Sequence, residues 1–177
     1  MQTFQNYILG QWVSGDGVET EQFNAITGAK IGEVSSAGID FSEVLNYGRT
    51  VGGHPLRKMT FQERGRMLKA LALHLMERKE KYYEISALTG ATRIDSWIDI
   101  EGGIGNLFSN ASLRRKLPDE TFALDGDAIP LSKNNSFMGH HILVPKEGVA
   151  VHINAYNFPV WGMLEKIAVN LLAGVPA

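Results

Sequence analysis

Hydrophobic positions recur at helical spacing through the middle of the chain. One apolar face predicts a long amphipathic helix from about residue 61 to about residue 78, and it includes Met67, Leu68, Leu71 and Leu75. Thr60 and Glu63 supply a capping box at the start of this helix. The same reasoning predicts a helix over residues 41–51, where Asp40 and Glu43 mark the start. A further helix is predicted from the end of the long one, near residue 78, to about residue 88, and another over 98–113.

Shorter apolar runs, separated by turn residues, predict strands at both sides of this helical region. Residues 7–13 indicate a strand, a turn at Gly10 and a second strand. Residues 23–34 indicate a hairpin that turns at Thr27 and Gly28. Residues 121–146 contain strand-like segments joined by polar turns, after a break at Pro118.

The last part of the chain has the pattern of a strand, a turn and an apolar helix. Val149, Ala150, Val151 and Ile153 predict a buried parallel strand, and Pro159 suits the first turn of a helix that continues to Leu172. The corner between them would lie at the carboxyl end of the strand, where open α/β sheets bind ligands. The next strand should begin where the sequence stops, so we expect a truncated β-α unit. Its helix would then expose an apolar stripe of Val160, Leu164, Ile167, Ala168 and Leu171.

Composition narrows the classes of function. The 177 residues suffice for roughly one domain, 44% of them are hydrophobic, and the net charge of −2 argues against nucleic acid as a partner. The sequence contains neither an export signal nor an apolar stretch that would span a membrane, so we expect a cytoplasmic protein. There is no cysteine, which excludes a thiolate nucleophile, a disulfide and a thiolate zinc site within these residues.

Three local features have a structural and a functional interpretation. Gly102, Gly103 and Gly105 invite a phosphate-loop interpretation, but Phe108 stands where the third glycine of that motif is required, and close packing of a helix is favoured for these glycines. The five histidines lack metal-ligand spacing, so no metal site is predicted, and a hydrogen-bonded structural role is favoured for His152. The basic cluster 114–116 is interpreted as a solvated helix end rather than a contact for a coenzyme A phosphate.

The sequence Asn157-Phe158-Pro159 after a predicted strand resembles the aldehyde dehydrogenase superfamily. Five further segments are similar to the semialdehyde dehydrogenase branch of phenylacetate degradation, in which the dehydrogenase is fused to a hydratase-like domain: residues 89–93, 95–97, 99–105, 129–133 and 161–166. The resemblance runs from about Tyr7 to Ala177.

This resemblance implies an α/β protein, the N-terminal part of the aldehyde dehydrogenase fold with a truncated Rossmann-like cofactor domain. Residues 1–120 would form strands and helices of the cofactor-binding domain. Residues 121–146 would form a β-flap used in homo-oligomer association. Residues 147–177 would form the first strand-turn-helix unit of the nucleotide-binding core.

The resemblance also implies the roles of individual residues. Asn157 would be catalytic, with its amide holding the oxyanion of a thiohemiacetal. Residues Ile153, Asn154, Ala155 and Tyr156 would line the cofactor, NAD or NADP; the family more commonly has Pro and Trp at the last two positions. Phe158, Gly162 and Glu165 would face the aldehyde channel. From the residues alone, Asn157 could instead cap the following helix, and Glu165 could pair with a neighbouring helix.

The function implied is oxidation of an aldehyde to a carboxylic acid as part of a longer chain. The substrate would be a CoA-linked semialdehyde of phenylacetate ring opening. A rival within the class is the semialdehyde dehydrogenase of aerobic benzoyl-CoA breakdown. A hypothesis from another class is a non-catalytic module that associates with full-length subunits. Because the chain contains no cysteine, we expect these 177 residues to be inactive alone.

Overall fold

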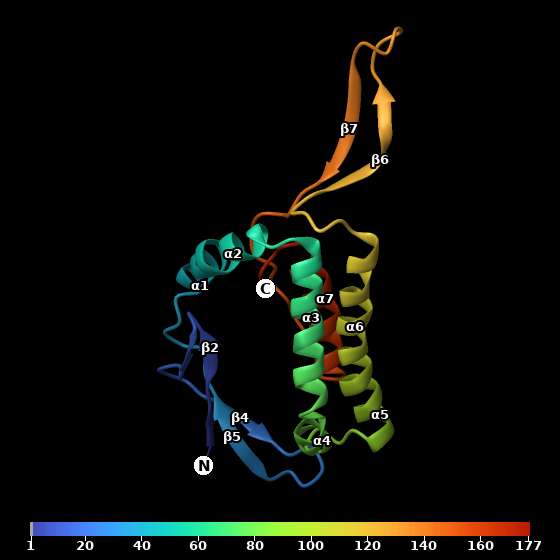
Figure 1. Ribbon diagram of the computed structural model, residues 1–177. Helices are drawn as coiled ribbons and strands as arrows, with labels where there is room; N and C mark the ends of the chain where they lie inside the picture. The colour runs from blue at the N-terminus through green and yellow to red at the C-terminus, as the bar shows by residue number, and fades with distance from the viewer. Residues whose placement is uncertain (1) are drawn as a thin grey trace.

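A computed structural model describes residues 2–177 and contains strands at its N-terminus, a layer of long helices and a projecting hairpin (Figure 1). The strands are β1 (Gln2–Phe4), β2 (Asn6–Ile8), β3 (Gln11–Val13), β4 (Thr20–Phe23), β5 (Lys30–Val34), β6 (Ala123–Pro130) and β7 (Met138–Leu143). The α-helices are α1 (Phe41–Tyr47), α2 (Gly53–Lys58), α3 (Phe61–Met76), α4 (Lys79–Ala87), α5 (Arg93–Trp97), α6 (Gly103–Ser112) and α7 (Pro159–Leu172). Two π-helical turns, η1 (Gly48–Gly52) and η2 (Ile98–Gly102), and a 3₁₀ turn, η3 (Leu113–Lys116), extend them.

The N-terminal strands form two small sheets. β5 lies between β1, to which it is parallel, and β4, to which it is antiparallel. β2 and β3 pair across a turn at Leu9 and Gly10, whose φ angles of 51° and 80° suit the right-handed twist of a tight hairpin. Both predicted hairpins are therefore confirmed, and the second turns at Gly28, where φ is +70°.

Helix starts follow the signals in the sequence. The carboxylate of Asp40 accepts hydrogen bonds from the first turn of α1, and Thr60 and Glu63 form the predicted capping box of α3. The helix predicted over 98–113 begins earlier, at Arg93, because Thr92 and Asp95 form a second capping box. The chain then continues without a break through η2 and α6.

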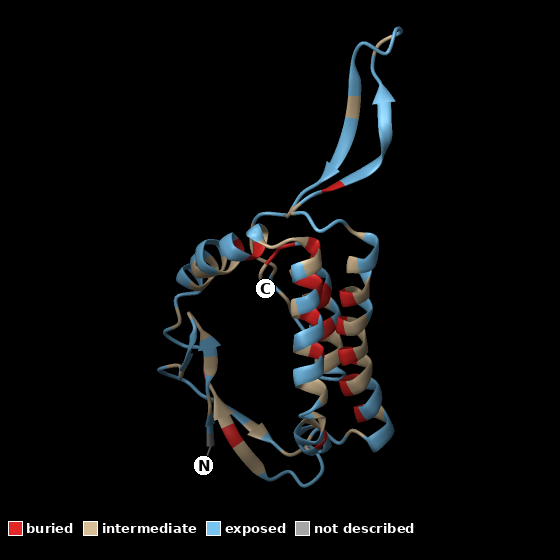
Figure 2. Ribbon diagram, in the orientation of Figure 1, coloured by how far each residue is buried: buried red, intermediate tan, exposed pale blue. Residues whose placement is uncertain are grey.

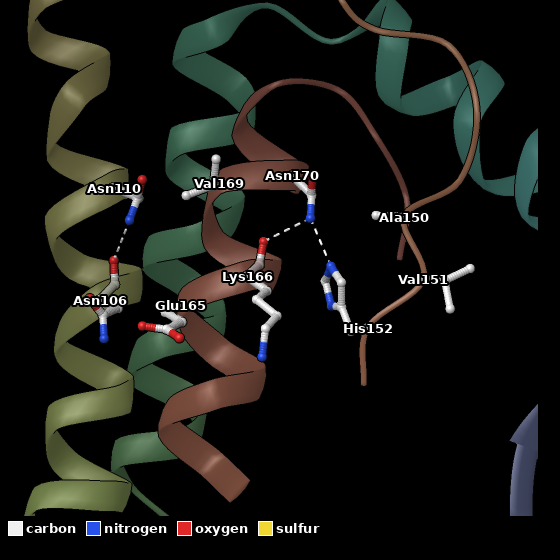
Figure 3. Close-up of a pocket in the computed structure, with 9 residues that line it drawn as sticks. All are labelled: Asn106, Asn110, Ala150, Val151, His152, Glu165, Lys166, Val169 and Asn170. Atoms are coloured by element: carbon white, nitrogen blue, oxygen red, sulfur yellow. Dashed lines mark hydrogen bonds between the residues drawn. The ribbon is translucent and has the colours of Figure 1, made fainter. Parts of the chain in front are cut away.

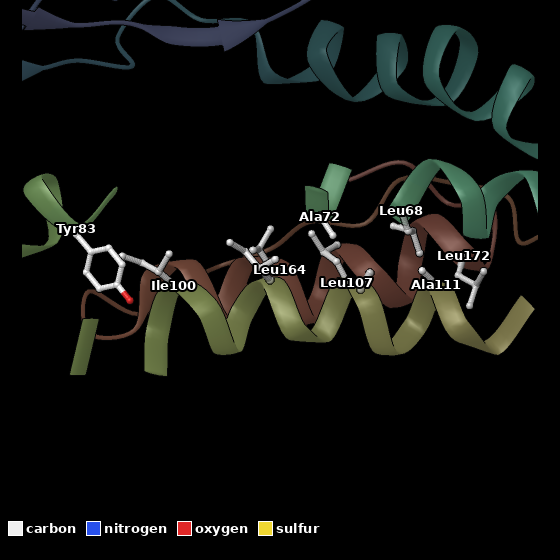
Figure 4. Packing of buried hydrophobic residues seen from close by; sticks show 10 residues of the cluster. Leu68, Ala72, Tyr83, Ile100, Leu107, Ala111, Leu164 and Leu172 are labelled. Carbon is white, nitrogen blue, oxygen red and sulfur yellow. The ribbon is translucent and has the colours of Figure 1, made fainter. Parts of the chain in front are cut away.

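The hydrophobic core lies where α3, α6 and α7 pack against one another (Figure 2, Figure 4). Its fully buried side chains include Leu68, Ile100, Ile104 and Leu107. Two residues of the α7 stripe that was expected to be exposed belong to this core, Leu164 at 2% exposed and Ala168 at 0%, and Val160 and Leu171 pack against it. That expectation was wrong because α3 and α6, rather than strands, cover this face of α7.

β6 and β7 form an antiparallel hairpin that extends away from the rest of the molecule (Figure 1). Its register shifts between Asp125 and Ile129, as at a β-bulge. Apart from Ala123 and Gly139, its strand residues are exposed, including several large apolar side chains. The strands predicted within residues 121–146 are thus confirmed.

The parallel strand predicted from Val149 to Ile153 does not form. The segment makes one backbone hydrogen bond, from the Ala150 N–H to the Pro176 carbonyl at 2.8 Å, and it belongs to no strand ladder. Val151 is 72% exposed and Ile153 is 89% exposed, so the apolar run is not buried. The apolar pattern was sufficient for a strand, but a strand also needs a ladder of partners, and residues 2–177 supply only this single bond.

Candidate functional site

The corner that leads into α7 is built on an unusual backbone conformation. Phe158, the residue that precedes the first turn of α7, has φ 54° and ψ 47°, in the left-handed region. A non-glycine residue in this region costs roughly 1–2 kcal/mol because its Cβ crowds the following carbonyl. Such conformations persist only where the surrounding structure holds them, and they are frequent at functional sites.

Asn157, the predicted oxyanion donor, lies exposed immediately before this residue. It does not cap the helix: the N-cap position is Phe158, and no side chain satisfies the first amides of α7 from that position. Within residues 2–177 the Asn157 side chain makes no hydrogen bond. Its amide is therefore available to donate to a bound group, while its catalytic role stays a prediction.

A residue that the sequence did not single out holds the start of α7. Asp99, on η2, is 4% exposed, and its carboxylate oxygen Oδ1 accepts a hydrogen bond of 2.7 Å from the backbone N–H of Trp161. This carboxylate lies at the positive end of the helix dipole, where an anion is favourable. It takes the place of a local capping side chain, although 62 residues separate it from Trp161.

Two glycines allow this close approach. A Cβ on Gly103 would lie 2.9 Å from Cα and 3.0 Å from N of Trp161, and a Cβ on Gly102 would lie 2.3 Å from Cζ3 of its indole ring. Both glycines have helical φ angles, −64° and −60° for Gly102 and Gly103, so they belong to a continuous helix rather than a phosphate loop. The predicted close packing is confirmed for these two, whereas a Cβ on Gly105 would meet nothing within 4 Å.

The residues predicted for the aldehyde channel lie along the first two turns of α7. The indole Nε1–H of Trp161 donates to Oε2 of Glu165 at 2.9 Å, so this carboxylate is held by its own helix and not by a neighbouring one. The carbonyl of Gly162 accepts a hydrogen bond of 3.0 Å from Nζ of Lys166. Phe158 is 38% exposed at the N-terminal end of the same helix.

The residues predicted to line the cofactor form an extended, exposed segment. Nζ of Lys166 also donates to Oδ1 of Asn154 at 3.0 Å, and thereby links the predicted cofactor segment to Gly162 of the predicted channel. Ile153 and Tyr156 are 89% and 100% exposed, and Ala155 is exposed as well. Lys166 thus connects Asn154 with Gly162. The side chains of Ile153, Ala155 and Tyr156 make no hydrogen bond to another described residue.

A groove of about 580 Å³ opens between α6, α7 and residues 150–152 (Figure 3). Asn106 and Asn110 line it from α6, one helical turn apart, and Asn170 lines it from α7. The amide Nδ2 of Asn170 lies 2.7 Å from Nε2 of His152 and donates to the Lys166 carbonyl at 3.0 Å. The structural role predicted for His152 is confirmed. The asparagines were missed, although the i, i+4 spacing of Asn106 and Asn110 indicates a shared face.

The remaining sequence features do not add to this site. Arg114 donates to the Ala111 carbonyl at 2.7 Å, as expected for a cation at a helix end. Residues 2–177 contain no cluster of three or more acidic or histidine side chains that could hold a metal ion. In the same described range, none of the helices combines the length and the apolar character needed to cross a bilayer.

Comparison with known proteins gives consistent matches along the chain. A model of the Aldehyde dehydrogenase family matches residues 12–176. A 3,4-dehydroadipyl-CoA semialdehyde dehydrogenase of Aromatoleum evansii is 41% identical over 172 residues, which are 97% of this chain and 33% of that protein. An N-succinylglutamate 5-semialdehyde dehydrogenase of Legionella pneumophila (strain Corby) is 26% identical over 180 residues, and the match covers 98% of this chain and 33% of that protein.

Solved structures agree with the sequence matches on the fold. A salicylaldehyde dehydrogenase from Pseudomonas putida G7, complexed with salicylaldehyde, superposes with a TM-score of 0.82 at 17% identity, over 99% of this chain and 35% of that one. An NADP-dependent glyceraldehyde-3-phosphate dehydrogenase from Bacillus halodurans C-125, complexed with NADP, gives a TM-score of 0.76 at 20% identity, over 99% of this chain and 36% of that one. The chain spans about a third of the length of the curated relatives it matches.

Proposed function

The chain belongs to the aldehyde dehydrogenase family, and on that premise we propose that it forms part of an enzyme that oxidises an aldehyde to a carboxylic acid with NAD or NADP. The observation that carries the proposal is the corner before α7. There an exposed Asn157 amide has no partner among the described residues and stands beside a left-handed Phe158. This arrangement suits a side chain whose task is to donate a hydrogen bond to a transient group.

Asn157 would act as an oxyanion donor. When a cysteine thiolate attacks an aldehyde, the carbonyl oxygen gains negative charge, and an N–H group placed near it lowers the energy of that state. The chain has no cysteine, so the nucleophile of this proposal comes from residues outside these 177. The contribution of this chain is therefore stabilisation of charge and not the covalent step.

The extended segment before Asn157 fits a nicotinamide cofactor. Ile153 and Tyr156 present exposed apolar surface, which a flat ring can cover, and Asn154 is held toward α7 by Lys166. When bound, such a cofactor supplies a hydride acceptor. We propose that Ile153, Asn154, Ala155 and Tyr156 border its nicotinamide and ribose.

For the substrate we propose a CoA-linked semialdehyde, the class named for the relative at 41% identity. The channel would run past Phe158, Gly162 and Glu165, and Gly162 would leave room for a long acyl chain. The narrower proposal is a semialdehyde from phenylacetate ring opening, and its rival is the corresponding step of aerobic benzoyl-CoA breakdown. Turnover of the two semialdehydes by the protein that contains this segment separates these alternatives.

We further propose that the enzyme is a cytoplasmic homo-oligomer that associates through the β6–β7 hairpin. The hairpin exposes apolar side chains on both strands, among them Leu124, Ile129 and Ile142, which are 58%, 49% and 53% exposed. An exposed, projecting hairpin of this kind presents unpaired edges and apolar surface to a second subunit.

The test is substitution of Asn157 in the protein that contains this segment. Asn157→Ala should lower kcat on the order of 10²–10³-fold, because it removes the donor, while cofactor affinity stays close to wild type. Asn157→Asp should be at least as slow, because an ionised carboxylate donates nothing and faces developing negative charge. A matched control is Asn24→Asp: Asn24 uses its side-chain oxygen to accept from the N–H groups of Ile26 and Thr27, which Asp does equally well.

The control variant should retain the wild-type kcat and thermal unfolding midpoint. An Asn157→Asp enzyme with normal kcat would rule out the oxyanion role. A fall in the unfolding midpoint without a specific loss of rate would likewise assign Asn157 to structure alone.

A further inference from the structure

The strained backbone at Phe158 must be held in place by its surroundings, because nothing local compensates for it. The left-handed φ of 54° reverses the chain between the extended segment 153–156 and α7, and so it sets the direction in which Asn157 points. No side chain of the corner itself caps the helix. Besides the bridge that Lys166 makes between Asn154 and the Gly162 carbonyl, a restraint on the first turn of α7 comes from another element.

Asp99 supplies that restraint. Its carboxylate on η2 accepts a hydrogen bond of 2.7 Å from the N–H of Trp161, three residues after Phe158. The residue is buried, with 4% of its surface exposed. A charge-assisted hydrogen bond in a buried position is strong and tolerates little change in distance. The first turn of α7 is thus fixed relative to the helical core, in addition to its link through Lys166 to Asn154 of the exposed segment.

Gly103 reinforces the restraint from the same side. Its Cα lies so close to α7 that a Cβ would be 2.9 Å from Cα of Trp161 and 3.2 Å from the carbonyl carbon of Val160. The backbone of residues 160–161 is therefore restrained twice: by the hydrogen bond to Asp99 and by close van der Waals contact with Gly103. The same packing places the Trp161 indole where it can bind Glu165.

We propose that Asp99 is a positioning residue that fixes the Asn157 corner by binding the first turn of α7. The proposal rests on the oxyanion role proposed above for Asn157. Asp99 does not touch the reacting atoms. It keeps the donor amide at the place where the negative charge develops, and a displacement of about 1 Å there can cost on the order of 10²-fold in rate.

The experiment uses the protein that contains this segment and measures kcat, KM for the aldehyde and cofactor affinity. Asp99→Ala, which removes the acceptor, should lower kcat by on the order of 10- to 100-fold with cofactor affinity unchanged. Asp99→Asn keeps an acceptor oxygen and should restore most of kcat. The matched control is Asp95→Ala: Asp95 lies one turn earlier and caps α5 through the N–H and hydroxyl of Thr92, so its loss should leave kcat unchanged.

A double-mutant cycle with Asn157→Ala identifies how Asp99 acts. If Asp99 acts through Asn157, then Asp99→Ala should cost little or nothing once the Asn157 amide is gone. Equal effects in both backgrounds would overturn the proposal, as would an unchanged kcat in Asp99→Ala or a failure of Asp99→Asn to restore activity. If Asp99→Ala does not fold, Gly103→Ala, which presses on the same backbone, takes its place in the cycle under the same criteria.

The cycle also separates this proposal from the proposed function. An Asn157→Ala enzyme with normal kcat refutes the oxyanion role, whatever Asp99 does. A slow Asn157→Ala enzyme combined with a fast Asp99→Ala enzyme leaves the oxyanion role intact and refutes positioning by Asp99.

Discussion

Gly103 offers a sharp test of how closely α6 and α7 must approach each other. Replacing it with alanine places a Cβ 2.9 Å from Cα and 3.0 Å from N of Trp161. Ordinary contacts of this kind are 3.4–4 Å, so the two helices must separate by several tenths of an ångström. The atoms in the way belong to the backbone, which cannot move aside as the end of a side chain does.

Two opposing effects determine how much Gly103→Ala changes the local stability of α6 and α7. Alanine favours a helix over glycine by up to about 1 kcal/mol, whereas overpacking of a tight contact costs about 1–3 kcal/mol. Gly105→Ala, on the same helix, isolates the first effect because its Cβ would meet nothing within 4 Å. The difference in local stability between the two variants is therefore the overpacking cost itself, about 1–3 kcal/mol.

The assay is hydrogen exchange of the α6 and α7 amides in the protein that contains this segment. Local unfolding free energies from exchange should fall in Gly103→Ala and stay level or rise in Gly105→Ala. If the amides of the two variants exchange alike, α6 and α7 are not in close contact at Gly103, and Gly103 does not restrain the first turn of α7.

The charged side chains of Glu101 and Arg64 give further predictions. Glu101 accepts from Lys79 at 2.8 Å and from the Tyr83 hydroxyl at 2.9 Å, and the Lys79 hydrogen bond, followed by that of Tyr83, lowers the pKa of the carboxyl. Because its folded pKa lies below the unfolded one, the stabilisation is present at neutral pH and is lost as the pH falls through the folded pKa. Glu101→Gln should therefore lower stability by about 1 kcal/mol at pH 7, and the thermal unfolding midpoints of the two proteins should converge once the pH is below the folded pKa. Arg64 is fully buried, and its Nε and Nη2 have no partner within residues 2–177. Its Nη1 donates to the carbonyls of Met59 at 2.9 Å and Leu56 at 3.4 Å, so Arg64→Met leaves these acceptors without their donor and should lower the unfolding free energy by about 1–3 kcal/mol in denaturant titration; an unchanged value would contradict this role.

Local signals in the sequence predicted much of the helical fold. The capping box at Thr60 and the aspartate at Asp40 act within three residues, so their partners can be read directly from the sequence. The turn at Gly28 follows from the same kind of local rule, since glycine tolerates a positive φ. These predictions succeeded because the atoms involved are neighbours along the chain.

The failures concern partners that are distant along the chain. The run Val149–Ile153 has the composition of a strand, but strand formation depends on a neighbour, and one bond to Pro176 is all that the described residues provide. The burial of Leu164 and Ala168 depends on α3 and α6, whose positions relative to α7 are not encoded in any local pattern. For Asn157, the sequence suggested both a cap and an oxyanion donor, and only the position of Phe158 at the N-cap excludes the first.

The separation of 62 residues between Asp99 and Trp161 has a functional consequence as well. The corner before α7 was expected to lie at the carboxyl end of a buried parallel strand, but the segment that leads into it is largely exposed and makes a single backbone hydrogen bond, from Ala150 to Pro176. Asp99, the buried charged group that binds the first turn of α7, comes from the helical layer that also contains the buried core. On the positioning role proposed for Asp99, rigidity at Asn157 would be transmitted from the side of α7 that faces the core. It follows that substitutions in the packed interface of α6 and α7 should alter the rate of the reaction more than equally destabilising substitutions in the small N-terminal sheets.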